Sequence, residues 1–359
     1  MIFRNIFIHG FYERPLMVTL AALLVFAACD KQSGNESTDG EDDQMSISFA
    51  GSPLQTKAGG GDVITNTDDK LKKAPFGIFG FKTSSDDSSI TGNLNNVFST
   101  TDAQEVGWSQ ADGKWTYSPK RRWENSMHYR FRAFWPYDVE LNPDSNASRI
   151  GIEYKATTES YDLLVAYATR YPLNDGIEPV RLVFHHALSG LRFKIRFDSK
   201  VKKGTVDYVN RFYLRGMYSV GYMIYGQMAD SDPVDKIEWI FDRYGNTFDK
   251  TSRMFDWTGN EKFSIAANAT DKSEVATVFD NDKVVFIPPQ TLSSSLGVTT
   301  ANFYTRTGGD ALHSVEIPTT KLEPGKIYTI TLVIHDTYLT VDIDIKDWDV
   351  LQSNVDINL

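Results

Sequence analysis

The sequence contains a single cysteine, Cys29, so no disulfide can form within the chain. Basic side chains are outnumbered by acidic ones, 37 against 47, which gives a formal net charge of -10. An acidic chain of this kind repels phosphate backbones, so we expect no nucleic-acid partner. The sequence also lacks a G-x-S-x-G motif and any nucleophile–base spacing. We therefore expect neither an enzyme nor a bound cofactor.

Apolar runs long enough to cross a bilayer are missing as well. The run of residues 16–28 follows a basic start and is typical of a signal-peptide core. Two alanines precede Cys29, an arrangement that resembles the lipobox of bacterial lipoproteins, whose cysteine is acylated and becomes the first mature residue. We expect residues 1–28 to be a lipoprotein signal peptide and Cys29 to carry the lipid. The alternative is a plain secretory signal with an incidental cysteine.

Helical periodicity is also missing, because no segment has the apolar spacing of a helix three turns long. Period-2 alternation is frequent, and aromatic residues make up 13% of the chain. The alternating segments predict strands at residues 45–50, 76–81, 95–101, 115–118, 128–135, 161–168, 206–214, 218–225, 237–241, 263–266, 283–287, 298–305, 314–317, 327–334 and 338–345. The sequence therefore predicts an all-β protein built of two β-sandwiches.

The segment of residues 180–197 has the clearest alternation in the chain. From Leu191 onward its apolar side chains occupy odd-numbered positions, whereas up to Phe184 they occupy even-numbered ones. A one-residue shift turns apolar side chains to the opposite face, and Gly190 suits a bulge or bend that resets the register. We interpret the segment as one long, kinked strand.

Composition also indicates where the chain divides. Residues 30–44 are polar and acidic and cannot bury enough surface to fold, so residues 29–44 are predicted to form a flexible tether. The charged stretch of residues 198–204 ends in glycine and predicts a domain junction. We expect an N-terminal β-sandwich domain over residues 45–200 and a C-terminal one over residues 201–359.

The chain ends in a short alternating segment, residues 354–359. Val355, Ile357 and Leu359 form one apolar face of a predicted terminal strand. Burying three such side chains contributes about 5 to 8 kcal/mol before the entropy of ordering is subtracted. Whether the strand joins its own sheet or that of another subunit is left open.

Two sets of residues invite a ligand. His185 and His186 are neighbours, and on a strand neighbours point to opposite faces, so the pair cannot bind one metal ion together. We expect no metal site there. A set of aromatic side chains either forms stacking platforms for sugar rings or fills the sandwich cores, and exposure discriminates between the two. The set comprises Trp108, Trp115, Trp123, Trp135, Tyr117, Tyr129 and Tyr137.

Short motifs along nearly the whole chain, taken in order, resemble those of the fimbrillin-like lipoproteins of Bacteroidetes, which are subunits of type V pili. They are the lipobox at Cys29, Leu54–Ala58 (LQTKA), Gly77–Gly80 (GIFG), Phe131–Tyr137 (FRAFWPY), Phe184–Leu188 (FHHAL), Phe286–Gln290 (FIPPQ), Leu322–Tyr328 (LEPGKIY) and Ile345–Trp348 (IKDW).

The resemblance implies two tandem transthyretin-like antiparallel β-sandwich domains. It also implies a precursor that is cut by a trypsin-like protease in the loop after its first strand, which opens a groove for a strand of another subunit. Lys57 matches the cleavage position, and Ile47 and Phe49 lie in the strand that would be displaced. The terminal segment, with Val355, Ile357 and Leu359, matches the donor strand.

The expected function is thus that of a structural, adhesive pilus subunit at the outer membrane and cell surface. Its partners would be other pilus subunits, the processing protease and, through the lipid on Cys29, the membrane. The alternatives are a pilus anchor or tip component and, from another class, a surface glycan-binding outer-membrane lipoprotein.

Overall fold

The structure is a computed structural model. It describes residues 45–52, 71–84, 95–98, 102–141, 145, 149–157, 161–198, 208–226, 236–243, 246–247, 254–257, 275–277, 284–293, 297–306, 310–335 and 338–347. The predicted signal peptide, the predicted tether with Cys29, Lys57, the predicted strand at 263–266 and the terminal segment 354–359 lie outside these residues.

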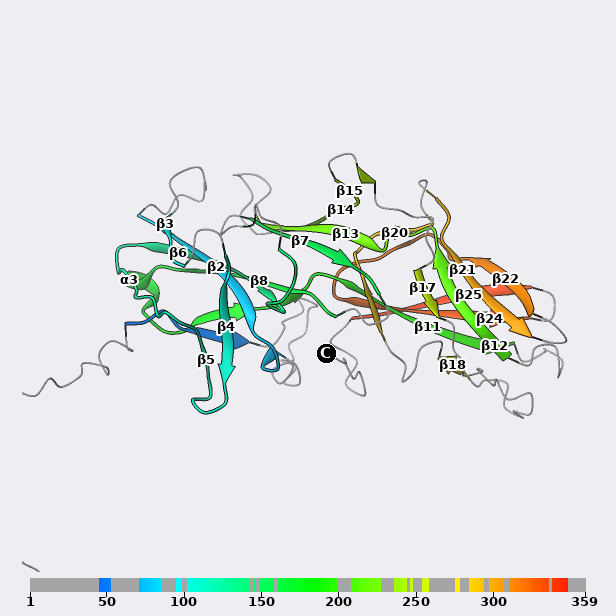
Figure 1. The fold of residues 1–359 in the computed structure, drawn as a ribbon, viewed down its shortest axis with the longest axis horizontal. Helices are drawn as coiled ribbons and strands as arrows, with labels where there is room; N and C mark the ends of the chain where they lie inside the picture. Colours follow the sequence, from blue (N-terminus) through cyan, green and yellow to red (C-terminus); the bar gives the residue numbers. More distant parts are fainter. Residues whose placement is uncertain are drawn as a thin grey trace, which may run out of the picture. The chain divides into compact units, whose positions relative to one another are not determined.

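The described residues form an all-β fold, as predicted (Figure 1). The helix that lies wholly among them is α3 (Pro172–Asp175), a single turn that begins with proline. No described helix has the length and apolar character needed to cross a membrane.

A seven-stranded sheet carries most of the first half of the chain (Figure 1). Its order is β10 (His185–His186), β8 (Leu164–Arg170), β6 (His128–Trp135), β2 (Phe76–Thr83), β4 (Gln104–Ser109) and β5 (Lys114–Thr116), with β3 (Asn95–Asn96) on β2. A separate two-stranded sheet pairs β1 (Phe49–Ser52) with β9 (Val180–Val183).

Three larger sheets contain most strands of the second half of the chain, together with β7 (Arg149–Lys155) from the first half. One is β18 (Val275–Thr277), β11 (Ser189–Phe197), β24 (Lys326–Ile334) and β25 (Leu339–Asp347), with β19 (Val285–Ile287) also on β11. Another is β17 (Met254–Trp257), β12 (Tyr208–Arg215), β21 (Thr300–Arg306) and β22 (Asp310–Glu316). A third is β14 (Lys236–Ile240), β13 (Val220–Gly226) and β7.

Two short ladders complete the described fold. They are β15 (Asp242–Arg243) with β16 (Asn246–Thr247), and β20 (Thr291–Leu292) with β23 (Thr320–Lys321). Among the described strands, β1 pairs in parallel with β9, and β11 pairs in parallel with β24. The other described ladders are antiparallel.

The interpretation of residues 180–197 as one long, kinked strand was wrong. The segment is divided into β9, β10 and β11, which pair with β1, β8 and β24 in three different sheets. Apolar side chains shift from even to odd positions where the chain passes from one sheet to the next. Alternation reports which face of a strand is buried, but it carries no information about the partner strand.

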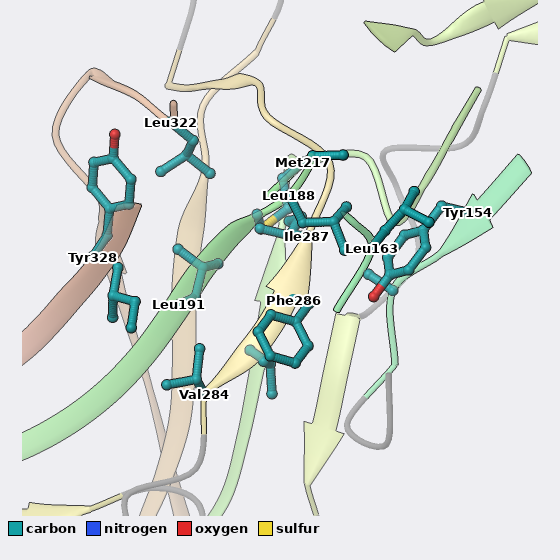
Figure 2. Close-up of a cluster of buried hydrophobic side chains, with 14 of the residues drawn as sticks. Tyr154, Leu163, Leu188, Leu191, Met217, Val284, Phe286, Ile287, Leu322 and Tyr328 are labelled. Carbon is teal, nitrogen blue, oxygen red and sulfur yellow. The ribbon is translucent and has the colours of Figure 1, made fainter. Parts of the chain in front are cut away.

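Strands from before and after residue 200 share sheets and one apolar cluster. β7 pairs with β13, and β11 pairs with β24. Figure 2 shows side chains of this cluster that come from both parts of the chain, among them Leu163, Leu188, Phe286 and Tyr328. The division into tandem domains at residues 200 and 201 stays a prediction.

Candidate functional site

The first described strand lies between two other segments of the chain. On one side β1 pairs in parallel with β9, with Phe49 opposite Val180, and the amide of Val180 donates to the carbonyl of Ser48 at 2.8 Å. On the other side, the residues just before β1 pair with the segment around Arg121. The amide of Ile47 donates to the carbonyl of Arg121 at 2.7 Å, and that of Trp123 donates to the carbonyl of Met45 at 3.0 Å. Residues 45–52 therefore complete ladders on both of their edges.

Ile47 and Phe49 are the two side chains that this segment places in the core. Ile47 is fully buried and Phe49 is 4% exposed, whereas Ser48 between them is half-buried and Ala50 is exposed. This is the alternation expected of a strand with one face on a core. The prediction of a strand at residues 45–50 is confirmed in character, although the regular ladder is β1, which begins at Phe49, and Ser46 contributes only an isolated bridge to Arg122.

Four aromatic rings surround Phe49. The ring of Phe131 lies 5.5 Å away and that of Phe76 6.3 Å away, both nearly perpendicular to Phe49, at interplanar angles of 85°. The rings of Tyr117 and Phe98 lie 5.8 and 6.3 Å away in tilted orientations. All four neighbouring side chains are buried. Edge-to-face contacts of this kind stabilise beyond the area that they bury. We call these four rings, with the space that Phe49 occupies, the aromatic pocket.

Tyr117 also holds the main chain of the same strand. Its hydroxyl donates to the carbonyl of Ile47 at 2.8 Å and accepts from the amide of Arg121 at 3.3 Å. Burial raises the pKa of Tyr117 to about 12, because the phenolate would lose its hydration. The hydroxyl is therefore neutral, and remains a donor, at any physiological pH.

Two of the predicted site residues lie in this site. Ile47 and Phe49 lie in it together, whereas Cys29, Lys57 and the predicted donor residues Val355, Ile357 and Leu359 lie outside the described residues. Phe76, Phe98 and Phe131 line the aromatic pocket, although no motif of the sequence predicted a site at these residues. Alternation in the segments around Phe76 and Phe131 predicts their buried faces, but nothing local predicts that these faces meet at Phe49.

The two histidines point to opposite faces of β10, as the sequence analysis expected. His185 is exposed, whereas His186 is buried and its Nδ1 lies 2.6 Å from Oδ2 of Asp162, also buried. No group of three or more potential metal-binding side chains occurs in the part of the chain that the structure describes. His186 is the last residue of β10, and Oδ1 of Asp162 also accepts from the amide of Leu163 at 2.8 Å, so the pair ties the end of β10 to the chain before β8.

The aromatic residues considered for sugar stacking fill the core instead. Trp115, Trp123 and Trp135 are each at most 5% exposed, and Tyr117 and Tyr129 are buried beside them. The half-buried Trp108 packs edge-on against Trp115 and lies under the ammonium group of Lys72. Buried rings offer no face to a sugar, so these five side chains do not form a platform, and Tyr137, like Trp108, is half-buried.

A model of the fimbrillin-like family matches residues 64–348, most of the chain. The chain belongs to this family. The match begins after β1, so the strand that completes the aromatic pocket precedes the matched residues. No curated protein matches the chain.

Solved structures of fimbrial proteins are similar to this fimbrillin-like chain. One is a fimbrial protein from Bacteroides vulgatus with a TM-score of 0.56 and 16% identity, aligned over 84% of this chain and 99% of the other. Another is the tip fimbrial protein Mfa3 of Porphyromonas gingivalis, with a C-terminal truncation, at a TM-score of 0.36, 10% identity and coverages of 77% and 96%. The first similarity shows a shared fold.

Proposed function

We propose that this fimbrillin-like chain is a structural, adhesive subunit of a bacterial surface pilus. In this proposal a trypsin-like protease cuts near Lys57, the segment with Ile47 and Phe49 leaves, and a strand from a neighbouring subunit takes its place. Membership of the fimbrillin-like family supports the assignment to a pilus and argues against an enzyme. The place of the first strand within the aromatic pocket supports the exchange.

The proposal is supported by the finding that one short segment, residues 45–52, supplies part of a core. Loss of residues 45–52 would uncover the pocket around Phe49 and the site of Ile47, and burying two such side chains is worth about 3 to 6 kcal/mol. The amide of Val180 and the carbonyl of Arg121 would lose their partners. A donated strand satisfies the backbone groups and fills the pocket at once.

Strand donation of this type links subunits head to tail. Because the donor surface and the acceptor surface differ, the contact is heterologous and produces an open filament instead of a closed ring. The C-terminal segment with Val355, Ile357 and Leu359 is the proposed donor of this chain, since its alternation matches that of a strand with one apolar face.

The proposed location is the outer membrane and cell surface, and then the fimbrium. Acyl chains on Cys29 would hold the precursor at the membrane, and the polar residues 30–44 would let it reach away from the surface. Release from this anchor would follow from the cut near Lys57, which separates the lipid from the rest of the chain.

Treatment of the purified precursor with trypsin tests this function. We expect a product that begins at Ala58 and, with time, SDS-resistant ladders of subunits on a gel. The variant Lys57→Ala should stay uncut at this position and form no ladder. Lys73→Ala, which removes an exposed lysine 16 positions after Lys57, is the matched control and should behave as the unmodified chain does.

Two outcomes would contradict the proposal. An unmodified chain that is cut at Lys57 and remains a monomer would argue for an anchor or tip component. Ladders that form equally well from Lys57→Ala would show that processing at this lysine is not what opens the site.

A further inference from the structure

We infer that the groove left by residues 45–52 binds most tightly a strand with an aromatic side chain at the position of Phe49, so a different subunit with such a strand fills it better than a second copy of this chain does. The inference rests on the strand exchange proposed above and goes beyond it by naming the chemistry of the partner.

The first step is the shape of the aromatic pocket. Phe131 and Phe76 present ring edges or faces to Phe49 at 85°, and Tyr117 and Phe98 close the remaining sides. The neighbouring rings also pack against one another, with Phe98 and Tyr117 at 5.5 Å and 88°. An interior packed in this way adjusts little when a side chain of another shape replaces the ring.

The second step is that the main chain fixes which residue of an incoming strand enters the pocket. Ile47 is held by its amide to the carbonyl of Arg121 and by its carbonyl to the hydroxyl of Tyr117. Every residue other than proline supplies the same two groups, so these contacts tolerate any sequence. Selectivity therefore falls to the side chains at the positions of Ile47 and Phe49, which alternate onto the core face. The groove therefore selects a strand that has an aliphatic residue at the position of Ile47 and an aromatic residue two positions later, at that of Phe49.

The proposed donor segment of the chain itself does not meet this requirement. Residues 354–359 read Asn-Val-Asp-Ile-Asn-Leu and contain no aromatic residue. Whichever way the segment is aligned, Val355, Ile357 or Leu359 would take the position of Phe49. A branched aliphatic side chain there leaves part of the pocket unfilled and loses the edge-to-face contacts. The C-terminal segment of a second copy therefore binds, but more weakly than a strand with an aromatic residue at this position.

Peptide exchange on the trypsin-cleaved chain tests the inference. Fluorescent peptides are added: residues 45–52, the same peptide with Phe49→Leu, residues 350–359, and the latter with Ile357→Phe. We expect Phe49→Leu to weaken binding about tenfold or more, because several ring contacts are lost together, and Ile357→Phe to strengthen binding by a similar factor.

Equal affinities within each pair of peptides would overturn the inference and leave strand exchange standing. No binding by any of the four peptides, with the cleaved strand still in place, would overturn strand exchange and the inference together.

The intact chain provides a second test that does not depend on cleavage. We expect Phe49→Leu to accelerate amide hydrogen exchange in residues 45–52 about tenfold, because the ring contacts hold the strand closed. Ile47→Leu, at the aliphatic position, is the matched control and should accelerate exchange less than about threefold. Equal acceleration in the two variants would overturn the selectivity of the pocket for a ring.

Discussion

The hydroxyl of Tyr117 donates a hydrogen bond of 2.8 Å to the carbonyl of Ile47, across 70 positions of sequence. The same hydroxyl accepts from the amide of Arg121, whose carbonyl accepts directly from the amide of Ile47. In a regular antiparallel pair both bonds between two such residues are direct. Here the side chain of Tyr117 is inserted into the second one, so a single hydroxyl closes the ladder beside the first strand.

Removing this hydroxyl should loosen the first strand selectively. We expect Tyr117→Phe to lower the free energy of opening of residues 45–52 by about 1 kcal/mol, because the carbonyl of Ile47 loses its donor while the ring stays in place. Amide hydrogen exchange resolved by peptide measures the change. Tyr129→Phe is the matched control, since the buried hydroxyl of Tyr129 accepts from the amide of Glu124 and has no bond to the first strand. Equal loosening by both variants would contradict the role of Tyr117.

Alkaline pH should destabilise the protein through the same group. The pKa of Tyr117 is raised from 10.0 to about 12 in the folded protein, so folding favours the neutral form. The resulting stability is fully present below pH 10 and is lost as the pH rises from 10 to about 12, by about 2 to 3 kcal/mol in all.

Urea unfolding between pH 9 and pH 12 measures this loss. Burial also raises the pKa values of Tyr129, Tyr161 and Tyr328, so these side chains add to it. The comparison with Tyr117→Phe isolates the part that Tyr117 contributes. A variant that loses stability as steeply as the unmodified chain would contradict the assignment.

A methyl group at Gly77 should destabilise the seven-stranded sheet. Gly77 on β2 is opposite Phe134 on β6, and a Cβ atom there would lie 2.1 Å from Cζ of that ring. The ring is fully buried and has little room to move, so Gly77→Ala should cost about 1 to 3 kcal/mol in the free energy of unfolding. Gly107 on β4 has open space where its Cβ would lie, so Gly107→Ala is the matched control. Chemical denaturation compares the two, and equal stability would contradict the close approach at Gly77.

The buried pair of Asp162 and His186 should contribute more to the free energy of unfolding than an exposed ion pair does. Asp162→Ala removes the partner of His186 Nδ1 and the acceptor of the amide of Leu163, so we expect a loss of about 2 to 4 kcal/mol. Asp342→Ala breaks the exposed pair with Arg196 and should cost less than about 1 kcal/mol. Thermal unfolding of both variants measures the difference, and the reverse order would contradict it.

The sequence predicted elements whose pattern is local. β6 spans the predicted residues 128–135, and β24 and β25 form the predicted hairpin after the turn at Gly325, whose φ of 72° requires a residue that tolerates the left-handed region. β7 was missed, although Ile150, Ile152 and Tyr154 occupy every second position of the sequence, which is a signal that could have found it.

By itself, the sequence determined that the protein is all-β and, for strands with one buried face, which face that is, because alternation is a property of neighbouring residues. In β6 both faces are buried, Arg130 and Arg132 included. The tertiary structure decided which strands become neighbours. It divided residues 180–197 among three sheets, and it gathered Phe49, Phe76 and Phe131 with Tyr117 into one pocket. Partner choice depends on contacts between residues far apart in the chain, and these contacts leave no periodic trace in any one segment.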